Sequence, residues 1–357
     1  MGPGDGSTSV PGRYDSQFDR RGQLAPGREA TPRPTVSVVA PLFNEVESLP
    51  AFYDRAAATL QRCADSYEII FVDDGSNDGS LDELHRLASR DPHVRVVSFS
   101  RNFGHQTAVT AGMNYSTGAA VVVIDSDLQD PPELIGDLLT RWREGYQVVY
   151  AVRRNRKEDW PKRTAYQLFY RLLRQLSYVN IPVDSGDFAI MDRRVVDLLN
   201  GMPERNRFVR GIRAWVGFRQ TGLEYDRQPR RAGASKYSYA KLMRLAYDGV
   251  VSYSFAPLRL VTQLGFLISA GAFASMLFIL GRKILFDIPL KGWTSTIVVI
   301  LFLGGAQLVS LGILGEYVAR IFDEVKGRPL YVVKDLIGFD TDILHHGDAE
   351  TQRNTIR

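Results

Sequence analysis

Residues 119–133 read AAVVVIDSDLQDPPE, a run of small and β-branched residues that ends in two aspartates, Asp125 and Asp127. A continuous apolar run is typical of a strand buried on both faces, as in a parallel sheet covered by helices. Helical patterns separate this run from others, so we expect an α/β domain with a mainly parallel sheet. The other runs of this kind are TVSVVA at 35–40, YEIIFV at 67–72, VRVVSFS at 94–100 and YQVVYAV at 146–152.

Two helices are predicted to begin just after strands. Asn44 with Glu47, and Ser80 with Glu83, have the spacing of a capping box. Ligands of open α/β sheets bind outside the carboxyl ends of the strands, so the loops at these ends are the expected crevice.

Composition limits the class of protein. The chain has 357 residues, is 45% hydrophobic and 24% charged, and has a formal net charge of +4, which excludes a largely disordered chain. Residues 1–34 are rich in Gly, Pro, Ser and Arg and have no apolar period or signal-peptide core, so we expect a disordered tail. The one cysteine, Cys63, excludes an internal disulfide and a multi-cysteine metal site. Because basic residues alternate with apolar runs, no nucleic-acid partner is expected.

Two stretches in the second half carry no charge, from Leu260 to Leu280 and from Ile297 to Leu314. They predict a two-helix transmembrane hairpin over residues 259–317, with spans at about 260–280 and 295–317. Two buried core helices are the alternative. Basic residues flank both outer ends and favour a cytoplasmic α/β domain with both termini cytoplasmic, although the loop between the spans is also basic. Small residues in GGAQLVSLG at 304–312 allow close approach of helices, so a homo-oligomer is possible.

Two segments mix basic, aromatic and aliphatic residues, at 163–179 and within 236–258. Both are predicted as amphipathic helices at the bilayer surface, and packing on the sheet is the alternative. The expected organisation is therefore an α/β domain at 35–235, a juxtamembrane segment at 236–258, the hairpin, and a cytoplasmic tail at 318–357.

The pair Asp125 and Asp127 points to metal chemistry. Mg²⁺ and Mn²⁺ take oxygen ligands and keep positions open for substrate phosphates, which two carboxylates at a strand end can satisfy. Gln129 adds a carbonyl oxygen. Acidic pairs also cap helices or face solvent, which is the alternative interpretation.

Polar residues also follow the first two strands, in APLFNE at 40–45 and VDDGSNDGS at 72–80. Carboxylates here could accept hydrogen bonds from a ribose or a base edge, whereas an Asp-Gly turn held by its own side chains is the alternative. The sequence lacks both G-x-G-x-x-G after the first strand and a P-loop, which argues against a dinucleotide oxidoreductase or a P-loop enzyme.

These strings together carry a resemblance. APLFNE, VDDGSNDGS, DSDLQDPPE, DSGDFAIMDRR and RAGASKYS occur in that order ahead of the predicted spans. The chain thus resembles inverting glycosyltransferases of family 2 with the GT-A fold, whose catalytic domain is Rossmann-like. More narrowly it resembles bacterial polyprenyl-phosphate glycosyltransferases, which are related to dolichol-phosphate mannose synthases. The similarity covers about residues 35–338.

The resemblance implies roles for individual residues. Asp184 and Asp187 fall on the motif considered for a catalytic carboxylate. A lipid phosphate is already ionised, however, so either aspartate could instead orient a sugar hydroxyl or an arginine. Cationic side chains at Arg230 and Lys236 would sit over the donor phosphates. The implied sets are catalytic Asp127, Asp184, Asp187 and Lys236; donor-binding Pro41, Asn44, Glu45, Asp73, Asp74, Asp125, Arg230 and Ser235; acceptor-phosphate Arg153 and Arg163; and metal-binding Asp125, Asp127 and Gln129.

The implied reaction transfers a sugar from a nucleotide diphosphate sugar to polyprenyl phosphate, such as undecaprenyl phosphate, with inversion at the anomeric carbon. Its product would be a lipid-linked monosaccharide for cell-envelope glycosylation, made at a bacterial plasma membrane. UDP-glucose is the first expected donor, with Mg²⁺ or Mn²⁺ as the cofactor. The alternatives are a mannose synthase using GDP-mannose and a non-catalytic nucleotide-binding membrane scaffold. A processive polysaccharide synthase is disfavoured because the chain lacks Q-x-x-R-W.

Overall fold

The structure is a computed structural model that describes residues 35–154, 185–205, 207–226, 256–286 and 292–339. Five strands form where the apolar runs predict them. They are β1 (Val36–Leu42), β2 (Tyr67–Asp73), β3 (Val94–Phe99), β4 (Ala120–Val123) and β5 (Val148–Arg153). Three further strands are β6 (Ser185–Asp192), β7 (Gln220–Tyr225) and β8 (Val333–Ile337).

Within the described ranges the strands form an eight-stranded sheet with the order β7-β5-β6-β4-β1-β2-β3-β8. Strands β4, β1, β2 and β3 run parallel to one another, and β7 is parallel to β5. Strand β6 is antiparallel to both β4 and β5, and β8 is antiparallel to β3. The predicted α/β sheet is therefore confirmed, as a mixed sheet in which parallel pairings are the majority.

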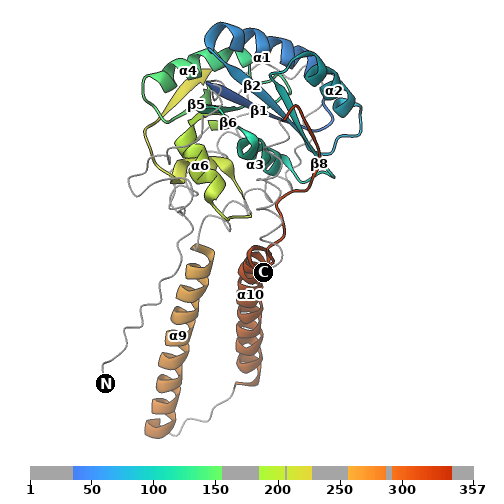
Figure 1. The fold of residues 1–357 in the computed structure, drawn as a ribbon. Helices are drawn as coiled ribbons and strands as arrows, with labels where there is room; N and C mark the ends of the chain where they lie inside the picture. Colours follow the sequence, from blue (N-terminus) through green and yellow to red (C-terminus); the bar gives the residue numbers. More distant parts are fainter. Residues whose placement is uncertain (1–34, 155–184, 206, 227–255, 287–291, 340–357) are drawn as a thin grey trace, which may run out of the picture. The chain divides into compact units, whose positions relative to one another are not determined.

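Helices cover both faces of this sheet (Figure 1). Helices α1 and α4 pack with the β1 side chains of Val36 and Val38, whereas α3 packs on the opposite face with Val39. On the α1 face lie α1 (Leu49–Cys63), α2 (Ser80–Arg90), the 3₁₀ turn η1 (Pro132–Leu134) and α4 (Ile135–Arg143). On the α3 face lie α3 (His105–Tyr115), α6 (Arg193–Gly201) and α7 (Val209–Trp215).

Both predicted capping boxes are wrong. Helix α1 begins at Leu49 rather than just after Asn44, and Gly79, not Ser80, precedes α2. Asn44 has a left-handed φ of 57°, and its Oδ1 accepts a hydrogen bond from the Asn77 N–H at 2.9 Å. Its side chain therefore ties two loops together instead of capping a helix.

Two long helices follow the α/β region, α9 (Ala256–Phe286) and α10 (Trp293–Val325), and they contact each other. Among the described residues, the stretch that is long and apolar enough to cross a membrane is Phe302–Val325. In α9, the apolar stretch found among the described side chains is Val261–Ser275. The structure thus contains both predicted helices, and by length and composition it supports one membrane span.

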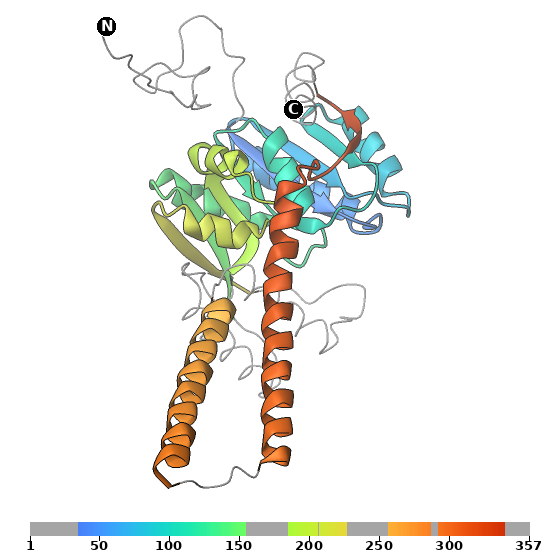
Figure 2. The same cartoon turned by 90° about the horizontal axis from the view of Figure 1, so that it is seen from below.

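The chain returns to the sheet after α10 (Figure 2). Strand β8, from the segment predicted as a tail, pairs with β3, and the Ser100 N–H donates to the Val332 oxygen at 3.0 Å. The Tyr331 ring stacks on Phe99 with 5.0 Å between centroids. Pairing with β8 covers the β3 edge, which would otherwise expose unpaired backbone groups.

Candidate active site

The loops after β1 and β2 are joined by side-chain hydrogen bonds at the carboxyl edge of the sheet. The Asn44 N–H donates to Ser76 Oγ at 2.9 Å, and the Glu45 N–H donates to Ser80 Oγ at 3.1 Å. The carboxylate of Glu45 accepts from Ser48 Oγ at 2.8 Å. These bonds fix the loop containing Pro41, Asn44 and Glu45 against the β2 loop.

Asp73 and Asp74 are both buried and hydrogen-bonded within the protein. Asp73 accepts from the Ser76 N–H at 3.0 Å and from Ser98 Oγ at 3.1 Å. The Asp74 carboxylate accepts from the backbone N–H groups of Phe103 and Gly104, which precede α3. Burial raises the pKa of Asp74, and these backbone bonds oppose the shift. Asp73 therefore holds its own turn, as the turn interpretation expects, whereas Asp74 holds the distant loop before α3.

Asp125 and Asp127, which follow β4, lie at the same carboxyl edge of the sheet. The Asp125 Oδ1 atom is buried and has no hydrogen-bond partner among the described residues; the nearest cationic atom is His105 Nε2 at 3.5 Å. Burial raises the pKa of the Asp125 carboxyl to about 6. Asp127 Oδ1 accepts from the Gln129 N–H at 3.0 Å, and Ser126 Oγ donates to the Pro41 oxygen at 3.1 Å. The loop from 125 to 129 is thereby joined to β1.

This arrangement fits a hard divalent cation. An unsatisfied buried carboxylate oxygen is stabilised by a positive charge. No group of three or more ligating His, Cys, Asp or Glu side chains occurs among the residues that the structure describes. Mg²⁺ commonly takes one or two carboxylates and completes its shell with water and substrate phosphates, so Asp125 and Asp127 suffice as protein carboxylates.

A charged cluster that the sequence analysis did not predict lies beside Asp125. Asp187 on β6 receives two hydrogen bonds from Arg210, from Nε at 2.7 Å and from Nη2 at 3.0 Å. Gln106 donates a third at 3.1 Å, and His105 Nε2 lies 3.4 Å away. The sequence signal for His105 was its place at the start of the helix after the 94–100 strand, on the same sheet edge as the aspartates.

These contacts set the charge of the cluster. Burial alone would raise the pKa of Asp187, but hydrogen bonds from His105 and Arg210 hold this pKa well below its usual range. The pKa of His105 is raised by Asp187 and Asp125, although burial opposes that shift. A carboxylate with a lowered pKa is a weak base, so Asp187 suits positioning better than proton abstraction.

Arg153, at the end of β5, is engaged in a second cluster. Its Nε atom donates to the Tyr225 hydroxyl at 3.3 Å, and its Nη2 lies 3.8 Å from Asp130 Oδ2. The Tyr225 hydroxyl donates to the buried Asp130. This cluster links the end of the DSDLQD string to the ends of β5 and β7; neither Asp130 nor Tyr225 was predicted from the sequence.

The structure thus brings some predicted residues together and leaves others undescribed. Asp125 and Asp187 share His105, and the loops of Pro41, Asn44, Glu45, Asp73 and Asp74 adjoin them. The predicted residues outside the described ranges are Arg163, Asp184, Arg230, Ser235 and Lys236.

Comparison with known proteins places this site in a family. The sequence profile of glycosyl transferase family 2 matches residues 37–199. The chain is also 45% identical over 310 residues to Uncharacterized glycosyltransferase YkcC of Bacillus subtilis, with 87% of this chain and 96% of that protein covered. The chain belongs to glycosyltransferase family 2. The family resemblance predicted from the ordered motifs is therefore confirmed.

Further relatives are similar to this chain over most of their length. The SfII prophage-derived bactoprenol glucosyl transferase of Shigella flexneri is 41% identical over 300 residues, which cover 84% of this chain and 97% of that protein. Among solved structures, mannosyltransferase PcManGT from Pyrobaculum calidifontis, in complex with GDP-Man and Mn²⁺, has a TM-score of 0.42 and 19% identity over 78% of this chain and 87% of that one.

Proposed function

We propose that this family 2 glycosyltransferase moves a sugar from a nucleotide diphosphate sugar to polyprenyl phosphate and inverts the anomeric configuration. The observation that carries the proposal is the 41% identity to a bactoprenol glucosyl transferase over almost all of that protein. The buried Asp125 oxygen at the carboxyl edge of the sheet, which has no hydrogen-bond partner among the described residues, supports a site for a metal-bound diphosphate.

Asp125 and Asp127, with Gln129, would hold Mg²⁺ or Mn²⁺, which when bound stabilises negative charge on the leaving diphosphate. An acceptor phosphate oxygen attacks the anomeric carbon, and the bond from that carbon to the nucleotide diphosphate breaks. Because the acceptor is already an anion, the reaction needs no general base, in agreement with the ion-paired Asp187. Arg230 and Lys236 are proposed to neutralise the leaving group, with Ser235 beside them.

The donor nucleotide is proposed to lie against the loops of Pro41, Asn44 and Glu45. Asp73 and Asp74 support these loops. Asp184 is proposed to lie near the sugar, where it would act as the catalytic carboxylate or orient a sugar hydroxyl. For the acceptor phosphate, Arg153 would contribute Nη1, because Nε and Nη2 already face Tyr225 and Asp130. Arg163 is proposed to assist it.

Membrane attachment brings the lipid acceptor to this domain. The stretch Phe302–Val325 is long and apolar enough to span a bilayer, and we propose that α9 completes a hairpin in the bacterial plasma membrane. The catalytic domain and both termini would then be cytoplasmic, and the juxtamembrane segment 236–258 would lie at the surface. Holding both substrates on one chain lowers the entropic cost of their encounter.

The test is transfer of label from a panel of UDP- and GDP-sugars to undecaprenyl phosphate by the purified full chain, counted in the organic phase. UDP-glucose is the donor expected to transfer label, with GDP-mannose as the alternative. Absence of label from every donor, with the protein folded and Mg²⁺ or Mn²⁺ supplied, would favour the non-catalytic scaffold.

A further inference from the structure

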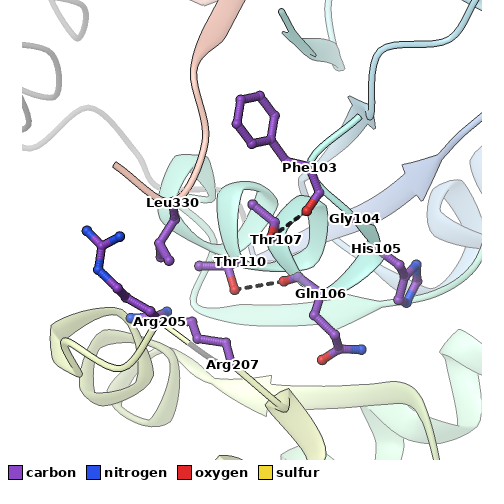
Figure 3. A pocket seen from close by; sticks show the side chains of 9 residues that line it. All are labelled: Phe103, Gly104, His105, Gln106, Thr107, Thr110, Arg205, Arg207 and Leu330. Carbon is purple, nitrogen blue, oxygen red and sulfur yellow. Dashed lines mark hydrogen bonds between the residues drawn. The ribbon is translucent and has the colours of Figure 1, made fainter. Parts of the chain in front are cut away.

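A cavity of about 310 Å³ lies beside α3. Three segments line it: α3 with the loop before it, the loop between α6 and α7, and the chain just after α10 (Figure 3). Its volume is at the lower end of the range of about 300–1,000 Å³ for ligand sites, which suits a headgroup with a few carbons. The side chains that the argument uses are His105, Arg205, Arg207 and Leu330.

The cavity is cationic. In the part of the chain that the structure describes, no carboxylate lies within ion-pair distance of the guanidinium group of Arg205 or Arg207. Arg207 donates from Nε to the backbone carbonyl oxygen of Glu204 at 3.1 Å and from Nη2 to the backbone carbonyl oxygen of Met202. These two bonds fix its side chain in place. Burial lowers the pKa of Arg207, so an anion beside it would relieve a desolvation cost. Fixed guanidinium groups suit phosphate oxygens.

The cavity also has apolar and hydroxyl-bearing walls. Leu330 contributes an apolar side chain, whereas the Phe103 ring points away and packs against Phe99 (Figure 3). The Thr107 and Thr110 hydroxyls donate within the α3 region, to the oxygens of Phe103 at 3.2 Å and Gln106 at 2.9 Å. Because these hydroxyls already donate within the protein, an anion in the cavity is best held by the guanidinium groups of Arg205 and Arg207, and Leu330 favours an anion that carries a hydrocarbon chain.

The cavity lies next to both the proposed metal site and helix α10. His105, which lines it, has Nε2 3.5 Å from Asp125 Oδ1, in the proposed metal site. Leu330 follows the end of α10, and the Arg205 N–H donates to both carboxylate oxygens of Glu324 in α10, at 3.0 and 3.2 Å. The cavity therefore lies between the helix apolar enough to cross a membrane and the carboxylates that face the donor.

We propose that this cavity binds the phosphate and first isoprene carbons of the polyprenyl phosphate acceptor. Arg205 and Arg207 hold the phosphate oxygens, and Leu330 contacts the hydrocarbon. The inference rests on the proposed function and deepens it, because it assigns acceptor-phosphate ligands in the loop before α7, in a cavity that Arg153 does not line. A phosphate here would approach the donor past His105.

Equilibrium binding of labelled undecaprenyl phosphate to the full chain in detergent tests this assignment. Arg205→Gln is the primary variant because its guanidinium has no partner among the described residues, so the fold does not depend on it. We expect a dissociation constant about tenfold higher, the loss of one charge-assisted hydrogen bond, and recovery to within threefold in Arg205→Lys. Arg90→Gln, on exposed α2, is the matched control and should bind like the wild type.

A second pair of variants separates charge from packing. Leu330→Glu and Leu330→Gln have nearly the same shape, and only the glutamate repels a phosphate. We expect Leu330→Glu to weaken acceptor binding at least tenfold more than Leu330→Gln. In turnover, Arg205→Gln should raise the KM for polyprenyl phosphate and leave the KM for the nucleotide sugar within twofold.

Competition identifies the ligand. Polyprenol without phosphate and inorganic phosphate should both compete poorly, since each offers half of the recognised chemistry. Equal displacement by phosphatidic acid would overturn the assignment in favour of a bilayer phospholipid, and equal displacement by inorganic phosphate would overturn it in favour of a simple anion site.

The variants can also overturn the assignment. They do so if Arg205→Gln and Leu330→Glu bind the acceptor and show a KM like the wild type in a protein that transfers sugar. Failure of the proposed function looks different, because the wild type would then bind the lipid and transfer nothing.

Discussion

Asp187 shows how neighbouring residues decide what a carboxylate can do. The family resemblance offers it either as a catalytic carboxylate or as a group that orients a sugar hydroxyl or an arginine, and the structure pairs it with Arg210 at 2.7 Å and bonds it to Gln106. A carboxylate held by two such donors keeps its charge and loses basicity. Its effect on the reaction is therefore expected to pass through the position of His105, next to Asp125.

Replacing this carboxylate should give a pH-dependent loss of stability. The pKa of Asp187 lies below its ordinary value of 3.8 in the folded protein, so its ion pair contributes stability that is complete above that pH and declines as pH falls below it. We expect Asp187→Asn to lower stability by about 1–3 kcal/mol at pH 7, with the difference from the wild type shrinking below pH 3.8. Thermal unfolding of the full chain in detergent measures this. Asp197→Asn, at an exposed position, is the control; a pH-independent difference for Asp187→Asn would contradict the ion-pair explanation.

At the scale of elements, the placement of α3 positions the site. Gly112 lets α3 pack closely on β1, since a Cβ there would lie 2.2 Å from Val39 Cγ1. Helix α3 carries His105 and Gln106 to the carboxyl edge, and its preceding loop is held by Asp74. A shift of this helix would therefore disturb the contacts of Asp125 and Asp187 together.

A glycine pair tests this packing. Gly112→Ala must push α3 from β1, and overpacking of this kind costs about 1–3 kcal/mol. Gly136→Ala in α4 is the matched control, because its Cβ would be 3.8 Å from its nearest neighbour and alanine favours a helix. Unfolding midpoints should fall for Gly112→Ala and hold or rise for Gly136→Ala. Equal midpoints would show that α3 does not pack as closely as described.

Strand β8 is the second element with a functional consequence, because it attaches the chain after α10 to the sheet. Tyr331 stacks on Phe99 and its hydroxyl accepts from Asn114 Nδ2 at 3.1 Å. Tyr331→Ala should loosen this attachment and speed hydrogen exchange at the Ser100 amide, which donates to Val332. Mass spectrometry of peptides covering residues 94–100 measures the effect. Trp215→Ala, at an exposed aromatic residue, should leave that exchange unchanged.

At the scale of the whole molecule, the sequence predicted the strands that are continuous apolar runs. It missed the strands without such runs and the contacts between residues far apart in the chain. Strands β1 and β2 are buried along their entire length, so their apolar runs were visible. Strand β6 is interrupted by Gly186 and Asp187, and β8 is half-buried, so neither shows such a run. The family followed from the order of five motifs.

The candidate site divides in the same way. Asp125 and Asp127 were predicted because both follow one buried strand. The contact between Gln106 and Asp187 joins residues 81 positions apart, and no local pattern encodes it. The capping boxes failed because Asn44 and Ser80 accept hydrogen bonds from neighbouring loops, tertiary contacts that override local spacing.

The most direct test of the central claim is metal-dependent transfer of labelled sugar to undecaprenyl phosphate by the wild type and Asp127→Ala, in parallel and with matched unfolding midpoints. The wild type should move label into the organic phase with Mg²⁺ or Mn²⁺ and stop when the metal is chelated. Asp127→Ala should lose about 100-fold or more of this turnover, whereas Asp137→Ala, at an exposed position on α4, should keep it. Wild-type turnover in Asp127→Ala, or undiminished transfer in chelator, would contradict a metal-assisted glycosyl transfer at the end of β4.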